Sequence, residues 1–324
     1  MDLFDGLKNK IAGKDIRVVF PEGSDARIIG AAVRLAADGL LIPVVLGDKE
    51  DIAALGAEHG FMTDRLEIIN PKTYEAKEAM VDALVERRAG KLTKADAYEW
   101  IQNENYFGTM LTYMGEVDAM ISGAIHSTGD TVRPALQIIK TKPGVSRTSG
   151  AFIIFKRNES YVFGDCAINI NPNAQELADI AIESAKTAEL FDIDPVVAML
   201  SFSTKGSAKS PEVDKVIEAT RLAQEAAPQY QIDGELQFDA AFDRVVGNLK
   251  APESEVAGHA RVFIFPEIQS GNIGYKIAQR LGGYEAIGPI LQGLNKPVSD
   301  LSRGCNEEDV YKLAIITAAQ ALMV

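Results

Sequence analysis

One short segment brings together three side chains that could carry out acyl or phosphoryl chemistry. In PVSDLSRGCNEED (297–309), Ser302 and Arg303 are adjacent, and Asp309 follows in the first turns of a helix expected over 307–323. A serine hydroxyl both donates and accepts hydrogen bonds, a guanidinium matches the oxygens of a phosphate or acyl phosphate, and a carboxylate can accept a proton. Asp309 is therefore either a base or an acidic residue that the helix dipole favours at a helix start.

Two further junctions combine small residues with polar ones. HSTGDTVRP (126–134) is expected as a glycine-bearing loop that carries Arg133, and PEIQSGNIG (266–274) carries Ser270, Gly271 and Asn272. Each junction follows an expected strand and precedes an expected helix. Small residues let the backbone approach a ligand, and helix N-termini offer N–H groups to phosphate. We expect Ser270, Gly271 and Asn272, together with Cys305 of the first segment, to line a cleft.

The sulfur and imidazole groups suggest less. Cys305 lies three residues after Ser302 and is either a nucleophile that forms an acyl intermediate or a small buried residue. Cys166 follows Gly164-Asp165 at a strand end, and no role is inferred for it. The three histidines are scattered without ligand spacing, so no metal site is expected.

Alternating strands and helices must position these groups. Short apolar runs typical of buried strands occur at 17–21, 42–47, 66–70 and 119–124. Ser24 is expected to cap the helix that follows the first run, and further helices are expected at 74–88, 93–102 and 104–115. This rhythm predicts an α/β protein with mainly parallel sheets, covered on both faces in three α/β/α layers.

The middle of the chain has a different pattern. Two β-rich runs within 148–166 are joined by the polar turn at 157–160, which predicts an antiparallel hairpin. We therefore expect two domains: residues 1–146 with 292–324, which include the last helix, and residues 147–291. The active site is expected in the cleft between them, because the loop before the last helix must meet Arg133.

The composition restricts the class of protein. A length of 324 residues suits two domains, and a net charge of −13 without a block of Lys and Arg argues against nucleic-acid binding. No apolar run reaches the ~18 residues of a membrane span. Two cysteines do not make a disulfide scaffold, and the N-terminus resembles neither a signal nor a transit peptide. A cytoplasmic location is expected.

Several motifs together resemble the phosphate acetyltransferase (phosphotransacetylase) family. They occur in the family's order: RPALQIIKTKPGV (133–145), LSFSTKGSA (200–208), GELQFDAA (234–241), FPEIQSGNIGYKIAQRLGG (265–283) and the signature PVSDLSRGC (297–305). The resemblance implies a fold like that of isocitrate and isopropylmalate dehydrogenases. It also implies reversible acetyl transfer between acetyl phosphate and coenzyme A, with coenzyme A as a substrate, no tightly bound cofactor, no metal and a homodimer.

The resemblance also implies roles for single residues in the signature. Ser302 and Arg303 match the family's Ser and Arg, and Asp309 matches its base, seven residues after the Ser. These roles fit direct attack of the coenzyme A thiolate in a ternary complex, in which Ser302 orients the thiol and Arg303 stabilises negative charge.

Arginines elsewhere in the chain are implied to bind the phosphate. Arg133 matches the family's TxRP motif. A second arginine is expected in the helix before ERRAGKLTKADA (86–97), where Arg87 and Arg88 are adjacent. The downstream match to Leu92 and Thr93 favours Arg87.

Other functions share part of this pattern. A phosphate butyryltransferase would use the same catalytic motif on a longer acyl chain. Metal-dependent decarboxylating dehydrogenases share the fold, but no cofactor fingerprint matches them. Domains that resemble this chain also occur as acetyl-CoA-sensing modules without activity, although the presence of Ser302, Arg303 and Asp309 together argues for an enzyme.

Overall fold

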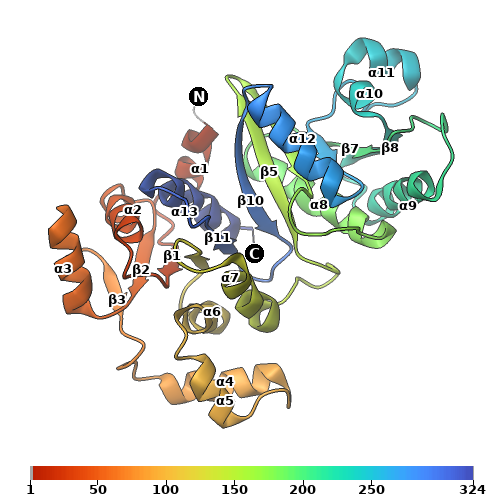
Figure 1. The fold of residues 1–324 in the computed structure, drawn as a ribbon. Coiled ribbons are helices and arrows are strands. Elements are labelled where there is room, and N and C mark those ends of the chain that lie inside the picture. The colour runs from red at the N-terminus through yellow and green to blue at the C-terminus, as the bar shows by residue number, and fades with distance from the viewer. Residues whose placement is uncertain (1–2, 324) are drawn as a thin grey trace. The chain divides into compact units, whose positions relative to one another are not determined.

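The computed structural model describes residues 3–323, which form two compact units (Figure 1). Unit 1 comprises Met1–Lys140 and Leu294–Val324, and unit 2 comprises Thr141–Gly293. The chain leaves unit 1 once and returns to it, so the C-terminal helix belongs to the same unit as the N-terminal strands. Within residues 3–323, no helix is both long and apolar enough to cross a membrane.

Unit 1 is built on a five-stranded sheet with the order β11-β4-β1-β2-β3, in which all pairs are parallel. Val18, Val19 and Phe20 of the central strand are fully buried, as expected for a parallel strand covered on both faces. The strands are β1 (Arg17–Phe20), β2 (Ile42–Leu46), β3 (Glu67–Ile69), β4 (Ala119–Ser122) and β11 (Val298–Asp300).

Helices cover both faces of this sheet. On one face α2 packs beside α13, and on the other α6 packs against β1 and β4 (Figure 1). Ile29, Ala32, Val45 and Ile52 form part of the buried core beneath α2. The helices of unit 1 are α1 (Leu3–Ile11), α2 (Ala26–Ala37), α3 (Lys49–His59), α4 (Lys77–Arg88), α5 (Lys94–Trp100), α6 (Glu104–Met114), α7 (Thr128–Pro134), the π-helical turn η1 (Ala135–Ile139) and α13 (Glu307–Ala321).

Unit 2 contains a six-stranded mixed sheet with the order β10-β5-β6-β9-β7-β8. The predicted hairpin is confirmed as β5 and β6, which pair antiparallel, while β9, β7 and β8 continue the sheet in parallel. The strands are β5 (Ser149–Lys156), β6 (Glu159–Gly164), β7 (Val196–Leu200), β8 (Gln231–Leu236), β9 (Val262–Ile264) and β10 (Glu285–Gln292). The prediction of an α/β protein with mainly parallel sheets is confirmed.

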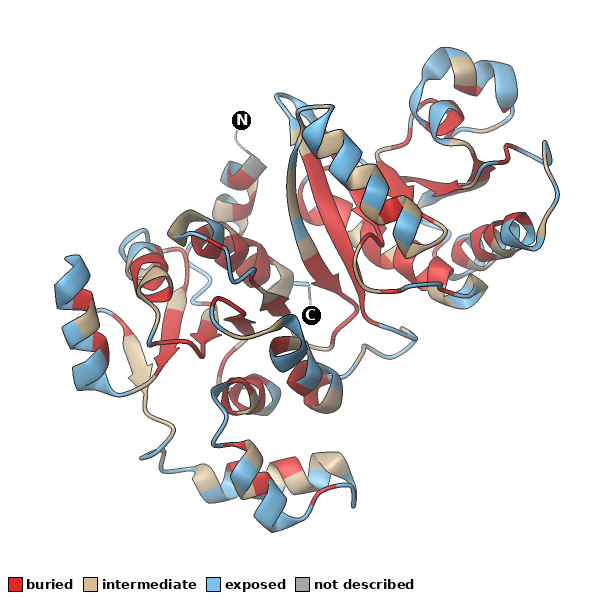
Figure 2. Ribbon diagram, in the orientation of Figure 1, coloured by how far each residue is buried: buried red, intermediate tan, exposed pale blue. Residues whose placement is uncertain are grey.

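The helices of unit 2 enclose an aromatic core. Phe152, Phe163, Phe263 and Phe265 are buried between the sheet and its helices, and Figure 2 shows β5 as largely buried. The helices are α8 (Ala174–Leu190), α9 (Pro211–Ala226), α10 (Phe238–Phe242), α11 (Arg244–Lys250) and α12 (Ile268–Arg280). Asn173 caps α8 in a capping box, as its position before the helix predicts.

Two local predictions were wrong. The cap of α2 is Asp25 and not Ser24, because the Asp25 carboxylate accepts a hydrogen bond from the N–H of Arg27. The expected loop at 126–134 is mostly helix, since Ser127 caps α7 and Pro134 falls at the end of α7, where the helix continues into η1. Gly129 therefore lies in a helix and not in a phosphate-binding loop.

Candidate active site

Three neighbouring strands of unit 1 end at the same edge of the sheet and lead into the candidate site. β11 pairs with β4 up to Asp300 and Ser122, and β4 in turn pairs with β1. The segments that follow are the signature loop (301–306), the β4 loop (123–127) and the β1 segment (21–25). The carboxyl edge of a parallel sheet is where α/β proteins bind ligands. The first segment leads into α13 and the second into α7, which carries Arg133.

The signature loop exposes its polar side chains. Ser302, Arg303 and Gly304 are exposed, and Ser302 Oγ accepts a hydrogen bond of 3.2 Å from the N–H of Gly304. Leu301 N–H donates to Ser122 O at 2.7 Å, which fixes the start of the loop to β4. Within residues 3–323, no acidic side chain pairs with the Arg303 guanidinium, so its donors are available to an anion.

Asp309 takes part in a reciprocal cap at the start of α13. Its N–H donates to Asn306 Oδ1 and its carboxylate accepts from Asn306 N–H, each at 2.9 Å. The side chain is exposed. Asp309 therefore does cap the start of α13, as one of the two interpretations predicts. The cap uses one carboxylate oxygen, and the second oxygen is left able to accept a proton.

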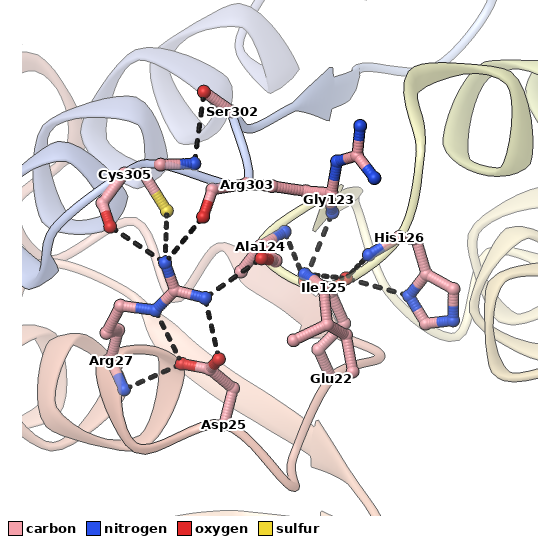
Figure 3. A network of polar contacts seen from close by, with 11 residues as sticks. Glu22, Asp25, Arg27, Gly123, Ala124, Ile125, His126, Ser302, Arg303 and Cys305 are labelled. Carbon is pink, nitrogen blue, oxygen red and sulfur yellow. Dashed lines mark hydrogen bonds and ion pairs between the residues drawn. The ribbon is translucent and has the colours of Figure 1, made fainter.

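A buried carboxylate that the sequence did not point to organises the β4 loop (Figure 3). Glu22 accepts hydrogen bonds from the N–H groups of four successive residues, 123–126, at 2.8–3.1 Å. His126 Nδ1 lies 2.7 Å from Glu22 Oε1. The N–H groups of residues 123–126 are therefore occupied within the protein and are not available to an external anion.

Arg27 connects the signature loop to the β4 loop (Figure 3). Its Nη1 donates to Arg303 O at 3.0 Å and to Cys305 O at 2.8 Å, and its Nη2 donates to Ala124 O at 2.9 Å. Asp25 holds the guanidinium through two hydrogen bonds, which raise the pKa of Arg27 and lower the pKa of Asp25. Arg27 also escaped sequence reasoning, because the three carbonyl groups that it contacts lie far away in the chain.

Burial perturbs two acidic groups of the signature segment. The pKa of the Cys305 thiol is raised by burial, although Arg27 Nη1 lies 3.8 Å from Sγ and acts to lower it. A raised pKa leaves less of the nucleophilic thiolate, which supports the interpretation of Cys305 as a small buried residue. The pKa of Asp300, which ends β11, is also raised by burial.

Arg133 lies in the last turn of α7. The helix is capped by Ser127, whose Oγ accepts from the Asp130 N–H at 3.3 Å and donates to the Asp130 carboxylate at 2.6 Å. Arg133 is exposed, and no carboxylate in the described part of the chain forms an ion pair with it. Burial raises the pKa of Tyr106, and the positive charges of Arg133 and Arg88 act to lower it.

Arg87 and Arg88 both reach from α4 to the carbonyl groups of η1. Arg87 donates to Ile138 O at 2.6 Å and to Ile139 O at 3.0 Å, and Arg88 donates to Gln137 O at 3.1 Å. The Arg87 guanidinium lies over Tyr113 and that of Arg88 over Trp100. Each arginine is therefore held by the segment directly after Arg133, and the choice between them as the substrate-side arginine stays a prediction.

Lys140 adds a further cation that sequence reasoning missed. It follows η1 with a φ of +63°, and its backbone is fixed because its N–H donates to Ala135 O and its C=O accepts from Asn295 N–H, each at 2.9 Å. The charge of Arg87, then burial and the charges of Arg88 and Lys91, lower its pKa. Like charges gathered in a protein of net charge −13 indicate a place for an anion.

The junction with Ser270 belongs to the sheet of unit 2. Glu267 caps α12 by accepting from the N–H groups of Gln269 and Ser270, each at 2.7 Å, so this helix N-terminus already holds a carboxylate. Gly271 lies against the backbone of Asp165, where an added Cβ would come within 2.8 Å of the carbonyl oxygen. Asn272 Nδ2 donates to Cys166 O at 3.2 Å.

Ser270 also lines a cavity of about 770 Å³ within unit 2. Phe202, Phe238 and Phe265 supply much of its apolar wall, and Lys215 and Glu267 lie at it. Among residues 3–323, no group of three or more His, Cys, Asp or Glu side chains is arranged to hold a metal ion.

Comparison with known proteins identifies the family. The family model described as "Phosphate acetyl/butaryl transferase" matches residues 2–318. Phosphate acetyltransferase of Bacillus subtilis is 60% identical over 321 residues, with 99% of each chain covered. A phosphotransacetylase structure from Streptococcus pyogenes matches with a TM-score of 0.97 and 60% identity, covering 99% of this chain and 98% of that one. The EutD phosphotransacetylase from Staphylococcus aureus matches with a TM-score of 0.95 and 57% identity over the same shares. These matches confirm the family resemblance: the chain belongs to the phosphate acetyl/butaryl transferase family and is an acyltransferase.

Proposed function

We propose that the chain catalyses reversible transfer of an acetyl group between acetyl phosphate and coenzyme A, giving acetyl-CoA and phosphate. The observation that carries this proposal is the position of the signature loop. β11 and β4 are neighbours, so Ser302 and Arg303 follow one strand end while α7 with Arg133 follows the next. Relatives about 60% identical over the full length are named phosphate acetyltransferases, which favours the acetyl group over butyryl.

In the proposed reaction, the coenzyme A thiol loses its proton and the thiolate attacks the carbonyl carbon of acetyl phosphate. Ser302 holds the thiol, and Asp309 accepts the proton with its free carboxylate oxygen. Arg303 receives the negative charge that develops on the carbonyl oxygen. The C–O bond to the phosphate then breaks, and acetyl-CoA and phosphate leave.

Cations of unit 1 bind the phosphate group in this scheme. Arg133 and Arg303 have no acidic partner among the described residues, and Arg87, Arg88 and Lys140 gather around η1. Arginine binds phosphate oxygens through two parallel hydrogen bonds, which explains how the phosphate is neutralised without a metal. The same cations serve both directions, because phosphate is the leaving group in one and the attacking group in the other.

The oligomer and location are part of this proposal. We propose that the enzyme acts in the cytoplasm as a homodimer with coenzyme A as a substrate and no tightly bound cofactor. Exposed apolar side chains on α11 and directly after α12 support self-association, since Leu249 of α11 is 80% exposed and Leu281, the C-cap residue of α12, is 85% exposed. Light scattering during size-exclusion chromatography measures the molar mass in solution, which should be that of two chains.

A coupled assay tests the activity. Purified protein is given acetyl phosphate and coenzyme A, and both thioester absorbance and released phosphate are recorded. Thioester and phosphate should form at equal rates, and both rates should require coenzyme A. If neither product forms, the proposed transfer is rejected. Initial rates are measured at varied concentrations of both substrates and drawn as double-reciprocal plots. Direct transfer in a ternary complex should give intersecting lines, whereas parallel lines would indicate an acetyl intermediate on Cys305. Relative rates on butyryl phosphate determine the acyl preference.

A further inference from the structure

Glu22 is a carboxylate removed from solvent and surrounded by backbone donors. Its side chain is 0% exposed. Oε2 accepts from Gly123 N at 3.1 Å and Ala124 N at 2.8 Å, while Oε1 accepts from Ile125 N and His126 N, each at 3.0 Å. Every N–H of the β4 loop up to His126 therefore points at one side chain.

This arrangement is one that proteins normally use to bind an external anion. Successive N–H groups at a turn before a helix form a concave anion site. Here the protein supplies the anion itself, from the segment that follows the neighbouring strand β1. A buried carboxylate is costly unless it is hydrogen-bonded, so the shape of the β4 loop and the position of the Glu22 side chain depend on each other.

Ala124 is held from both of its ends. Its N–H donates to Glu22, and its carbonyl accepts from Arg27 Nη2 at 2.9 Å. The same guanidinium reaches the carbonyls of Arg303 and Cys305 at 3.0 and 2.8 Å. In Figure 3 the contacts of Glu22 and Arg27 meet at the β4 loop from opposite sides, and the Arg303 side chain extends away from Arg27.

We propose that Glu22 is a positioning residue for acyl transfer. By fixing the β4 loop, it sets the start of α7, which carries Arg133, and through Ala124 and Arg27 it relates this start to the signature loop with Arg303. The inference rests on the proposed function, in which Arg133 and Arg303 bind one small substrate. A misplacement of about 1 Å can cost about 10²-fold in rate, so fixing these two loops relative to each other has a direct catalytic effect.

The decisive variant is Glu22→Gln. The amide keeps the size of the side chain but turns one acceptor oxygen into a donor that faces backbone donors. We expect kcat/KM for acetyl phosphate to fall at least about tenfold, with a smaller change in KM for coenzyme A. The variant is then combined with Arg133→Ala. If Glu22 acts by positioning Arg133, the loss caused by Glu22→Gln should be several-fold smaller in the Arg133→Ala background.

A matched control separates positioning from general stability. Asp179 of unit 2 is also a buried carboxylate, and it accepts from the Ser146 N–H at 2.9 Å and from Gln175 at 3.0 Å. Asp179→Asn should lower the unfolding temperature without a coupled effect on Arg133. Equal fold-losses from Glu22→Gln with and without Arg133 would overturn the proposal, as would wild-type kinetics of a folded Glu22→Gln.

A second variant and a readout without turnover complete the test. If Glu22→Gln does not fold, Arg27→Lys is combined with Arg133→Ala in the same way, because a lysine cannot reach Ala124 and Cys305 at once. Amide hydrogen exchange should accelerate at both 123–126 and 303–306 in either variant. Acceleration at only one of the two loops would reject the proposed connection. If the wild-type protein shows no acetyl transfer, the proposed function fails, while hydrogen exchange still decides whether the two loops are linked.

Discussion

Asp309 and Asn306 hold each other through two hydrogen bonds of 2.9 Å, from the N–H of each residue to the side chain of the other. The residue proposed as the base is therefore also a cap of α13. A substitution at position 309 changes both roles, and separating them requires a variant that changes only the cap.

Asp309→Asn should lower kcat without lowering stability by more than about 1 kcal/mol. An asparagine oxygen can still accept from the Asn306 N–H, but it cannot take a proton from the thiol. If Asp309 is the base, kcat falls by about 10² to 10⁴ and both KM values stay within a few-fold. Stopped assays of kcat and thermal unfolding of the same preparation measure the two effects.

Asn306→Ala is the matched control for Asp309→Asn. It removes the side-chain acceptor for the Asp309 N–H and keeps the Asp309 carboxylate, so stability should fall by about 0.5–2 kcal/mol with near-normal kcat. If Asp309→Asn shows the same pattern as Asn306→Ala, Asp309 is only a cap, and the thiol proton leaves to solvent.

The arginines differ in what their loss should do. Arg133→Ala should raise KM for acetyl phosphate by about 10- to 150-fold, the equivalent of a lost charge-assisted contact of about 1.5–3 kcal/mol. KM for coenzyme A should change far less. Equal changes in both KM values would contradict a phosphate role. Arg87→Ala and Arg88→Ala, measured side by side, show which neighbour has that effect.

Stability helps to interpret the pair on α4. Arg87 makes two hydrogen bonds to the carbonyls of η1 and Arg88 makes one, so Arg87→Ala should lower the unfolding temperature more. If the KM effect follows Arg88→Ala and the stability effect follows Arg87→Ala, then Arg88 is the substrate-side residue and Arg87 holds η1.

Much of the fold could be predicted because its signals are local. The hairpin of β5 and β6 was found from its β-rich runs and polar turn, and the cap at Asn173 from its place before an apolar period. The start of α7 was missed because Gly129 and Pro134 favour a loop by residue type. In the structure, the Ser127 cap and the burial of Thr131 and Pro134 stabilise a helix there instead. Asp25 was missed because Ser24 is an equally good cap by residue type.

The signature residues were found by resemblance, but the residues that hold them were not. Arg27 lies 276 residues from Arg303 in the chain, and Glu22 lies 102 residues from Ala124. Neither contact leaves a periodic or spaced pattern in a single sequence. Lys140 was missed for a similar reason, because its setting depends on charges from α4 that only the fold brings near.

Gly123 is a point of close approach between the β4 loop and the signature loop. A Cβ at this position would lie 2.6 Å from both Leu301 O and Asp300 Oδ1, and its φ of +111° is unfavourable for other residues. Gly123→Ala should therefore displace the signature loop and lower both kcat and stability, the latter by more than about 1 kcal/mol.

Gly129→Ala provides the control for Gly123→Ala. A Cβ there meets nothing closer than 3.7 Å and the residue lies in α7, so alanine should leave stability unchanged or raise it by up to about 1 kcal/mol. Similar losses from both variants would contradict the close approach as the cause. Thermal unfolding and kcat of the two variants decide.

Lys140 should make phosphate binding depend on pH. The charge of Arg87 lowers the Lys140 pKa below its ordinary value of 10.5, so the ammonium loses its proton at a lower pH than a free lysine does. If the ammonium binds the phosphate, KM for acetyl phosphate in the wild-type protein should rise as the pH increases through that lowered pKa. Lys140→Arg should remove this rise, because a guanidinium stays protonated throughout the range.

Lys140→Met should have a higher KM for acetyl phosphate at neutral pH and lose the pH dependence, because no charge remains to titrate. Lys142→Met removes an equal charge two residues away and should keep the wild-type dependence of KM on pH. If the effect of Lys140 came only from the general electrostatic field, the two substitutions would change KM alike. KM is measured from pH 7 to pH 10 at constant ionic strength, because screening would otherwise change with the buffer. The sign is fixed by the linkage: a bound anion favours the protonated lysine, so binding can weaken only as the pH rises. If KM for acetyl phosphate depends on pH in the same way in the wild-type protein and in Lys140→Arg, another group titrates. Lys140 would then have no part in phosphate binding.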